Sequence, residues 1–243
     1  MLARLIVLLC LLAGAGAAEE RRLLDAEAAA PFRGVGRLNV AGRRFCTATL
    51  ISPQVIVTAA HCLYHPRTGA RVPLGEFRFV AGLRRGEVAA LGRPVRAVTH
   101  ADFAFGAPDL AGVGADLALM ELDRPVPEGD AAPFAVGPPG DGALAIVSYR
   151  RDRAQVPSIA EPCATVVAAA GIMALDCPIT YGVSGAPVLA LDDGGPRVVA
   201  VVSAMGETIA GGRSVALTVL LAPEIEALLA ALAEAPLELP ELD

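Results

Sequence analysis

The sequence contains no lysine, and its 20 basic side chains are all arginines that stand alone or in pairs. Binding along a nucleic-acid backbone needs basic side chains gathered into a stripe or patch that neutralises several phosphates. The chain instead carries a formal net charge of −6 at pH 7 and shows no such stripe. We therefore expect no nucleic-acid partner.

Motifs that hold metals or nucleotides are missing too. The chain has 3 histidines, no HExxH spacing, no CxxC pair and no glycine-rich phosphate loop. Such motifs supply the nitrogen and sulfur ligands of zinc sites and the backbone amides that hold phosphates. The sequence thus predicts no metal site, no nucleotide and no other cofactor.

Long apolar runs are scarce, although 54% of the residues are hydrophobic, because alanine makes up much of that share. Residues 1–17 combine a basic Arg4, a short apolar run and a small-residue exit, which is typical of a cleaved secretory signal. The run is too short to span a bilayer. Cys10 lies inside it behind a bulky residue, which argues against a lipid-anchored cysteine. We expect cleavage near Ala17 and no stable membrane insertion afterwards.

Four cysteines remain after this segment, which is an even number. In an exported chain, an even set predicts two disulfides formed in an oxidising compartment. We therefore expect a secreted or periplasmic protein. Residues 18–33 would form a propeptide or an N-terminal segment, and whether it is cut near Arg21 and Arg22 stays open.

The sequence does contain many short apolar or alternating runs separated by Gly, Pro and Asp, a pattern typical of β-strands. In the first half they are 37–40, 45–51, 55–59, 77–81, 95–99 and 116–122, and in the second half 143–149, 164–169, 172–175, 186–191, 198–204 and 215–221. Residues 124–141 are rich in proline and glycine and indicate an irregular crossover. We expect an all-β fold of paired barrels at 34–123 and 142–222.

The C-terminal part of the sequence has a helical pattern instead of a strand pattern. Residues 223–235 begin with Pro223 and acidic residues, which favour a helix start, and carry leucines at 228, 229 and 232 on one face. We interpret this segment as a helix that covers a barrel end. The acidic, proline-broken tail at 236–243 is not expected to fold.

Two stretches of the sequence carry side chains that could react together. His61 follows the apolar run at 55–57, and Ser184 lies in the glycine-flanked turn 182–187. A lone buried histidine is usually a packed residue, and a serine between glycines is usually a turn residue. A serine hydroxyl, however, becomes a nucleophile when a neutral imidazole takes its proton. The two segments therefore predict a nucleophile and its base.

The imidazole in turn needs a carboxylate to orient it. Asp102, Asp109 and Asp116 all lie between His61 and the crossover. Asp116 opens an apolar strand that can hold its carboxylate fixed, whereas the other two lie in a loop of small residues and proline. We therefore favour Asp116. The order His, Asp, Ser also differs from the Ser, Asp, His order of α/β hydrolases.

The segments VIVTAAHC at 55–62, ADLALMEL at 115–122 and GVSGAP at 182–187 resemble the three signatures of trypsin-like serine proteases. The resemblance covers residues 34–235. It implies two six-stranded antiparallel β-barrels with the site in the cleft between them and a C-terminal helix packed on the second barrel. It also implies Ser184 as nucleophile, His61 as general acid and base, and Asp116 as orienting carboxylate. The amides of Gly182 and Ser184 would form the oxyanion hole.

The cysteines fit this resemblance. Bridging Cys46 to Cys62 would pin the histidine loop, and Cys163 would pair with Cys177 across the second barrel. The chain departs from pancreatic-type members at Val183, where those proteins carry an aspartate that pairs with a new amino terminus on activation. In this respect it is more similar to the bacterial glutamyl-endopeptidase branch.

The primary pocket is expected from the same resemblance. Its walls would come from Pro178, Ile179, Thr180, Ser203, Met205 and Arg213. Pro178 stands at the pocket floor, so cleavage after basic residues is not expected. Val202 replaces the histidine that the glutamyl branch carries before Ser203, which argues against acidic specificity unless Arg213 supplies the charge. An apolar pocket for small or medium side chains is the hypothesis that remains.

Two functional classes follow from these residues. The first is an exported serine endopeptidase that acts as a monomer on protein or peptide substrates. The second is a binding protein that kept the protease fold without activity. The presence of all three residues of the triad favours the first, because a binding protein has no need of them. His65 and His100 are interpreted as surface residues without a role.

Overall fold

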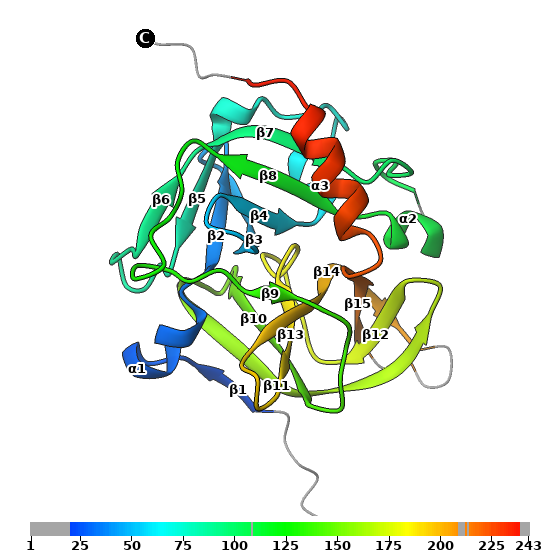
Figure 1. Cartoon of the computed structure of the whole chain (residues 1–243). Coiled ribbons are helices and arrows are strands. Elements are labelled where there is room, and N and C mark those ends of the chain that lie inside the picture. The colour runs from blue at the N-terminus through cyan, green and yellow to red at the C-terminus, as the bar shows by residue number, and fades with distance from the viewer. Residues whose placement is uncertain (1–19, 108, 209–211, 213, 239–243) are drawn as a thin grey trace, which may run out of the picture.

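The computed structural model describes residues 20–107, 109–208, 212 and 214–238. The predicted signal segment, Arg213 and the end of the acidic tail lie outside these residues. Two antiparallel β-sheets stand one above the other, and a helix lies across the outside of the upper sheet (Figure 1). The predicted all-β class with two barrels and a C-terminal helix is confirmed.

The first sheet is built from residues of the first half. In sheet order its strands are β6 (Ala90–Gly92), β5 (Phe77–Ala81), β2 (Val35–Val40), β3 (Arg44–Leu50), β4 (Val55–Thr58), β8 (Ala118–Leu122) and β7 (Pro94–Thr99). Within the described residues no ladder joins β6 to β7, so this barrel is open on one side. Alternate side chains such as Leu38, Phe79 and Met120 fill its interior and are fully buried.

The second sheet closes on itself. Its ring runs β11 (Arg153–Ala169), β10 (Ala143–Arg150), β13 (Pro187–Leu191), β14 (Arg197–Glu207), β15 (Ser214–Leu220) and β12 (Ile172–Asp176), and β12 pairs with β11 again. Two short strands, β1 (Glu20–Leu23) and β9 (Ala135–Val136), add to its outside. Valines and alanines dominate its core, as expected for a small barrel whose interior is filled by side chains.

Most predicted strands are present within a few residues, but β11 is much longer than the predicted 164–169. Pro157 and Pro162 interrupt its apolar pattern, and prolines argue against a strand. Pro162 falls where the register between β10 and β11 shifts, so it displaces no ladder hydrogen bond to β10. The sequence pattern also missed β1, β6, β9 and two short helices, α1 (Ala26–Ala29) and α2 (Leu110–Gly114).

The N-terminal segment is part of the second sheet. Strand β1 pairs with β11 along its whole length, and Arg22 forms an ion pair with Glu161. Leu24, which follows, is 1% exposed in the apolar cluster between the two barrels. A cut near Arg21 and Arg22 would therefore divide a paired strand.

The C-terminal helix α3 (Ile225–Glu234) was expected on the second barrel, and this expectation was wrong. The helix lies against β7 and β8 of the first barrel (Figure 1). Leu228 and Leu232 are buried, whereas Leu229 is 41% exposed. His100, which was interpreted as a surface residue without a role, is only 19% exposed and has Nε2 3.1 Å from Glu224 Oε2 at the helix start.

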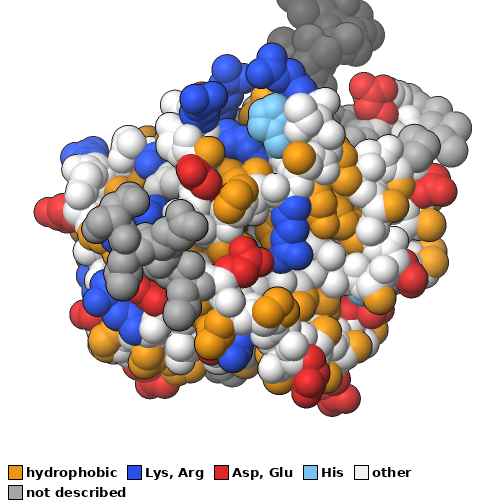
Figure 2. Space-filling view, turned by 90° about the horizontal axis from the view of Figure 1, so that it is seen from above, with side chains coloured by type: hydrophobic (Ala, Val, Ile, Leu, Met, Phe, Trp, Pro, Cys, Tyr) orange, Lys and Arg blue, Asp and Glu red, His pale blue; other side chains and the backbone are white. Residues whose placement is uncertain are grey.

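The outer face over the first barrel and α3 mixes basic, acidic and apolar side chains (Figure 2). In the part of the chain that the structure describes, none of the helices is both long and apolar enough to cross a membrane.

Candidate active site

Pairing between β4 and β8 brings His61 and Asp116 together. Thr58, at the end of β4, pairs with Ala118, at the start of β8. In an antiparallel pair, the residues after one strand and before the other meet at the same end. His61 follows β4 in the short 3₁₀ helix Ala60–Leu63, and Asp116 precedes β8, so both reach the same edge of the barrel.

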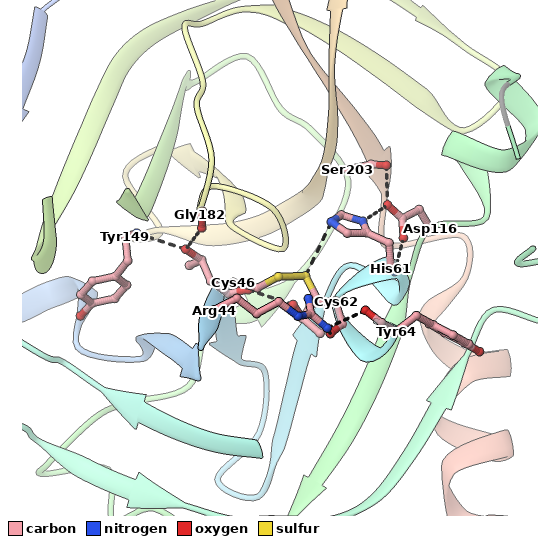
Figure 3. The surroundings of a disulfide bond; sticks show 11 residues. Arg44, Cys46, His61, Cys62, Tyr64, Asp116, Tyr149, Gly182 and Ser203 are labelled. Carbon is pink, nitrogen blue, oxygen red and sulfur yellow. Dashed lines mark hydrogen bonds and ion pairs between the residues drawn. A yellow bond between two sulfur atoms is a disulfide. The ribbon is translucent and has the colours of Figure 1, made fainter. Parts of the chain in front are cut away.

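The 3₁₀ helix that carries His61 is held from two sides (Figure 3). A disulfide joins Cys62 to Cys46 on β3. The Arg44 guanidinium donates hydrogen bonds to the carbonyl oxygens of Cys62 and Tyr64. His61 Nε2 lies 3.8 Å from Cys62 Sγ, but this sulfur is bonded to Cys46 and offers no thiolate to a metal. The backbone around the imidazole is therefore fixed.

The Asp116 carboxylate is the centre of the site. It is 4% exposed and accepts three hydrogen bonds. Oδ1 accepts the backbone N–H of His61 at 2.8 Å, and Oδ2 lies 2.7 Å from His61 Nδ1 and 2.6 Å from Ser203 Oγ. A carboxylate only accepts, so Nδ1 carries a proton. In the neutral ring, Nε2 is then left with a free lone pair that can take a proton.

The other two aspartates that the sequence left open lie elsewhere. Asp109 accepts the N–H of Gly112 at 2.9 Å and caps α2. Asp102 is exposed, and its backbone N–H donates to Nδ1 of His100. Neither carboxylate bonds His61 among the contacts of the described residues.

The loop with Ser184 packs closely against the end of β4. The N–H of Gly185 donates to the Val202 carbonyl at 2.8 Å, and the Ser184 carbonyl accepts from the N–H of Thr47 at 2.9 Å. Gly185 has φ of +79°, and a Cβ there would overlap with the side chain of Thr58. Only glycine fits this close approach. The loop thus lies against the strand end from which His61 follows.

Within the described residues, the Ser184 hydroxyl makes no hydrogen bond, so the contact from Oγ to His61 Nε2 is not formed in this conformation. Ser184 is partly exposed. Catalytic hydrogen bonds are often long without substrate and tighten when it binds.

Two backbone amides of the loop lack acceptors, whereas their neighbours have them. Val183 donates to the Thr180 carbonyl at 3.2 Å, and Ala186 donates to the Val183 carbonyl at 2.9 Å. In the part of the chain that the structure describes, the N–H groups of Gly182 and Ser184 have no hydrogen-bond partner. These two donors are free to bind an oxygen atom that carries negative charge.

Thr47 on β3 connects the two barrels next to this loop. Its Oγ1 donates to the Gly182 carbonyl at 3.0 Å and accepts the N–H of Tyr149, on β10, at 3.1 Å. Its carbonyl oxygen accepts the Thr58 hydroxyl at 2.9 Å. Sequence reasoning missed Thr47, because nothing in its local pattern distinguishes it from other strand residues.

Ser203 makes a contact that the sequence did not predict. Its hydroxyl donates to Asp116 and the residue is 7% exposed, while its role as a wall of the substrate pocket stays a prediction. It stands at a register shift between β14 and β15, where Val202 pairs with Thr218 and Ala204 with Leu217. Such a β-bulge re-aims a side chain, and bulges occur next to active sites. The shift turns Ser203 toward the aspartate.

The remaining pocket residues are spread out. Pro178 and Ile179 line a small, partly open cavity of about 10 Å³, together with the buried Val183. Met205 is 50% exposed on β14, Thr180 is partly buried, and Arg213 lies outside the described residues. A wider apolar groove of about 930 Å³ lies between α2, β12 and β15, and none of the predicted site residues lines it.

Both disulfides are present in the structure. Cys46–Cys62 ties β3 to the histidine helix, and Cys163–Cys177 ties β11 to the residue after β12. All four cysteines are at most 5% exposed.

Comparisons with known proteins agree with this arrangement. The trypsin family model matches residues 26–220. The fold is similar to that of the thermostable serine protease AL20 from an extremophilic microorganism, with a TM-score of 0.65, 17% identity, and 84% of this chain and 99% of that chain covered. It is also similar to a Glu endopeptidase in complex with MPD, with a TM-score of 0.69, 17% identity, and 89% and 98% covered. A search of curated proteins found no match.

At 17% identity, the two solved structures show a similarity of fold alone. The family model, in contrast, spans most of the chain and includes the segments with His61, Asp116 and Ser184. The chain belongs to the trypsin family.

Proposed function

We propose that this protein is an exported serine endopeptidase in which Ser184, His61 and Asp116 act as the triad. One observation carries the proposal. The imidazole of His61 is held through Nδ1 by a buried carboxylate, which leaves Nε2 free to take a proton beside the serine loop. The two unpaired amides of Gly182 and Ser184 add support, because an acyl-transfer site needs donors where negative charge develops.

In the proposed acylation step, Ser184 Oγ attacks the carbonyl carbon of the scissile peptide bond while its proton passes to His61 Nε2. The carbonyl electron pair moves onto its oxygen, which the amides of Gly182 and Ser184 bind. When this pair returns, the carbon–nitrogen bond breaks and the proton on Nε2 moves to the leaving amine. The acyl group then remains on Ser184.

Deacylation repeats these steps with water in place of the serine. His61 takes a proton from the water, and the resulting oxygen attacks the acyl carbon. The bond to Ser184 Oγ breaks, and His61 returns the proton to that oxygen. Asp116 stabilises the imidazolium in both acylation and deacylation and keeps the ring in one tautomer. Ser203 helps by fixing one oxygen of the Asp116 carboxylate.

For the acyl side of the substrate, we propose an apolar preference. Met205 offers half-exposed apolar surface on β14, Ile179 is a partly buried apolar residue, and Pro178 carries no charge at the expected pocket floor. Thr180 and Arg213 are kept as candidate walls from the family resemblance. The two disulfides support an oxidising compartment, so we place the protein outside the cytoplasm, secreted or periplasmic, as a monomer.

The proposal is tested with a fluorophosphonate probe and a peptide library on purified protein whose disulfides have been mapped. We expect covalent labelling at Ser184, located by mass spectrometry, and hydrolysis of internal peptide bonds. The Ser184→Ala variant is the control and should lose both. A correctly folded protein that neither labels nor hydrolyses would instead be the inactive binding protein. Consistent cleavage after Glu or Arg would contradict the apolar preference alone.

A further inference from the structure

Arginines from separate parts of the chain meet beside the Ser184 loop. Arg37 lies on β2, Arg85 follows β5, and the remaining ones belong to the turn between β10 and β11. We call this group the arginine surface; its members are Arg37, Arg85, Arg150, Arg151 and Arg153. In Figure 3, Tyr149 and Gly182, which border it, lie on the opposite side of His61 from Ser203.

Arg37 is held directly behind the loop. Its guanidinium stands over the Phe45 ring, 5.3 Å from the ring centre, and Nη1 donates to the Ala154 carbonyl at 3.0 Å. The Phe45 ring packs against Gly182 so closely that a Cβ at 182 would lie 2.6 Å from it. The stacked arginine is therefore one ring away from a predicted oxyanion amide. In the part of the chain that the structure describes, Nη1 makes its only hydrogen bond and Nε is buried without a partner, which leaves Nη2 as the donor group that is neither paired nor buried.

Arg151 lies in the turn between β10 and β11 and contacts the Ser184 loop. Its backbone N–H donates to the Tyr181 carbonyl at 2.8 Å, and its guanidinium lies 6.0 Å from the centre of the Tyr181 ring. Tyr181 immediately precedes Gly182 and is 66% exposed. No ion pair holds the Arg151 guanidinium in the part of the chain that the structure describes. A substrate that crosses the loop would meet this charge.

The neighbouring residues keep the surface positive. The N–H of Arg85 donates to the Gln155 carbonyl at 2.7 Å, which brings that turn beside Arg153. The nearby acids are Asp152, which forms an ion pair with Arg150 at 3.1 Å, and Glu87, which lies in the same turn as Arg85. The arginines outnumber the acids here, although the whole chain carries a net charge of −6.

We propose that the arginine surface selects substrates with Asp or Glu on the leaving-group side, within two residues after the cleaved bond. This inference rests on the proposed function. In that proposal, Met205 on β14 is a wall for the acyl side of the peptide. On the other side of Ser184, the leaving-group side would pass Gly182 and Tyr181, where Arg151 stands and behind which Arg37 is stacked on Phe45. A guanidinium binds a carboxylate through two parallel hydrogen bonds, and its stacking on an aromatic ring fixes its plane.

The test uses pairs of internally quenched peptides that differ in one residue, Asp against Asn, at the first or second position after the cleaved bond. We expect kcat/KM of the full chain to be roughly 5- to 20-fold higher for Asp at one of these positions, because partial exposure and salt weaken each pair. Raising the salt concentration should reduce the ratio. In Arg151→Gln, the ratio should fall to within about twofold of one.

A charge swap makes the test sharper. Arg151→Glu should favour Lys over Asp at the same position, which a merely structural role for Arg151 would not produce. Arg93→Gln is the matched control, because Arg93 is exposed and lies at the far end of the β7–β8 pair, away from Asp116. It should keep the ratio of the unmodified protein.

Three outcomes overturn the inference alone. The first is equal cleavage of the Asp and Asn peptides by an active enzyme, and the second is an acidic preference that survives in Arg151→Glu. Binding of a short duplex DNA that depends on Arg151, without any acidic preference in cleavage, would also overturn it. A protein that cleaves no peptide and does not label at Ser184 contradicts the proposed function, and this inference with it.

Discussion

At the scale of single residues, the order of the site depends on the Asp116 carboxylate, because three donors from two barrels converge on it. Replacing one oxygen by an amide group introduces N–H donors that face other donors. The ring of His61 can then be held with the proton on the wrong nitrogen. A residue that never touches substrate thereby controls the base.

We expect Asp116→Asn to lower kcat roughly 10³- to 10⁴-fold at neutral pH, with the fold retained. Steady-state kinetics on a peptide substrate measures the effect. Asp109→Asn is the matched control, since Asp109 only caps α2, and its activity should change little. A loss of less than tenfold in Asp116→Asn would mean that His61 does not depend on this carboxylate.

Gly185 is the residue whose missing side chain lets the serine loop approach β4. Gly185→Ala should lower the free energy of unfolding by roughly 2–5 kcal/mol, because left-handed strain adds to overlap with Thr58 and Thr47. Gly195 has φ of +88° with no atom within 4 Å of a Cβ, so Gly195→Ala carries the strain alone, about 1–2 kcal/mol. Urea unfolding of both variants measures the difference. Equal losses would show that the close approach does not matter.

At the scale of elements, the helix α3 is anchored by one row of leucines. The pattern placed Leu228, Leu229 and Leu232 on a single face, but only Leu228 and Leu232, one turn apart, are buried, whereas Leu229 is 41% exposed. The helix rests on β7 and β8, and Glu224 adds the polar contact to His100.

Leu228→Ala should cost about 2–5 kcal/mol of unfolding free energy, because a buried leucine leaves a cavity. Leu229→Ala removes the same atoms from a half-exposed position and should cost less than about 1 kcal/mol. Thermal and urea unfolding compare the two. Similar losses of unfolding free energy in the two variants would mean that both leucines are equally buried, which would contradict the observed packing of α3.

At the scale of the whole molecule, Tyr149 joins the barrels through a buried phenol that donates to the Leu83 carbonyl at 2.9 Å. Burial raises the pKa of this phenol well above its usual range. The folded protein therefore keeps a proton that the unfolded chain releases near pH 10. The free energy of unfolding is unaffected by this group below about pH 10 and falls as the pH rises further.

We expect urea unfolding of the Ser184→Ala background, which avoids self-cleavage, to show this alkaline loss. Tyr149→Phe should flatten the slope above about pH 10 while losing about 1 kcal/mol at neutral pH from the missing hydrogen bond. The chain has no lysine to obscure the effect. Tyr181→Phe, at a 66% exposed position, should leave the slope unchanged. An unchanged slope in Tyr149→Phe would show that another group is responsible.

Local patterns were enough for much of this molecule. Alternating apolar residues identified most strands, since a strand buries every second side chain whatever its partners are. The segments with His61, Asp116 and Ser184 were identified from their resemblance to the trypsin-family signatures, and their catalytic roles stay a prediction. The β4–β8 pairing then places the first two at one edge.

Other features depended on which strands pair and in which register. A bulge in β14, and not any local motif, places the Ser203 hydroxyl on Asp116. The arginines stand alone or in pairs along the chain, and the contacts of Arg37 with Ala154 and of Arg85 with Gln155 bring them together. Periodicity reports which face of a strand is buried, whereas the partner across the sheet is decided by long-range packing that short stretches of sequence do not encode.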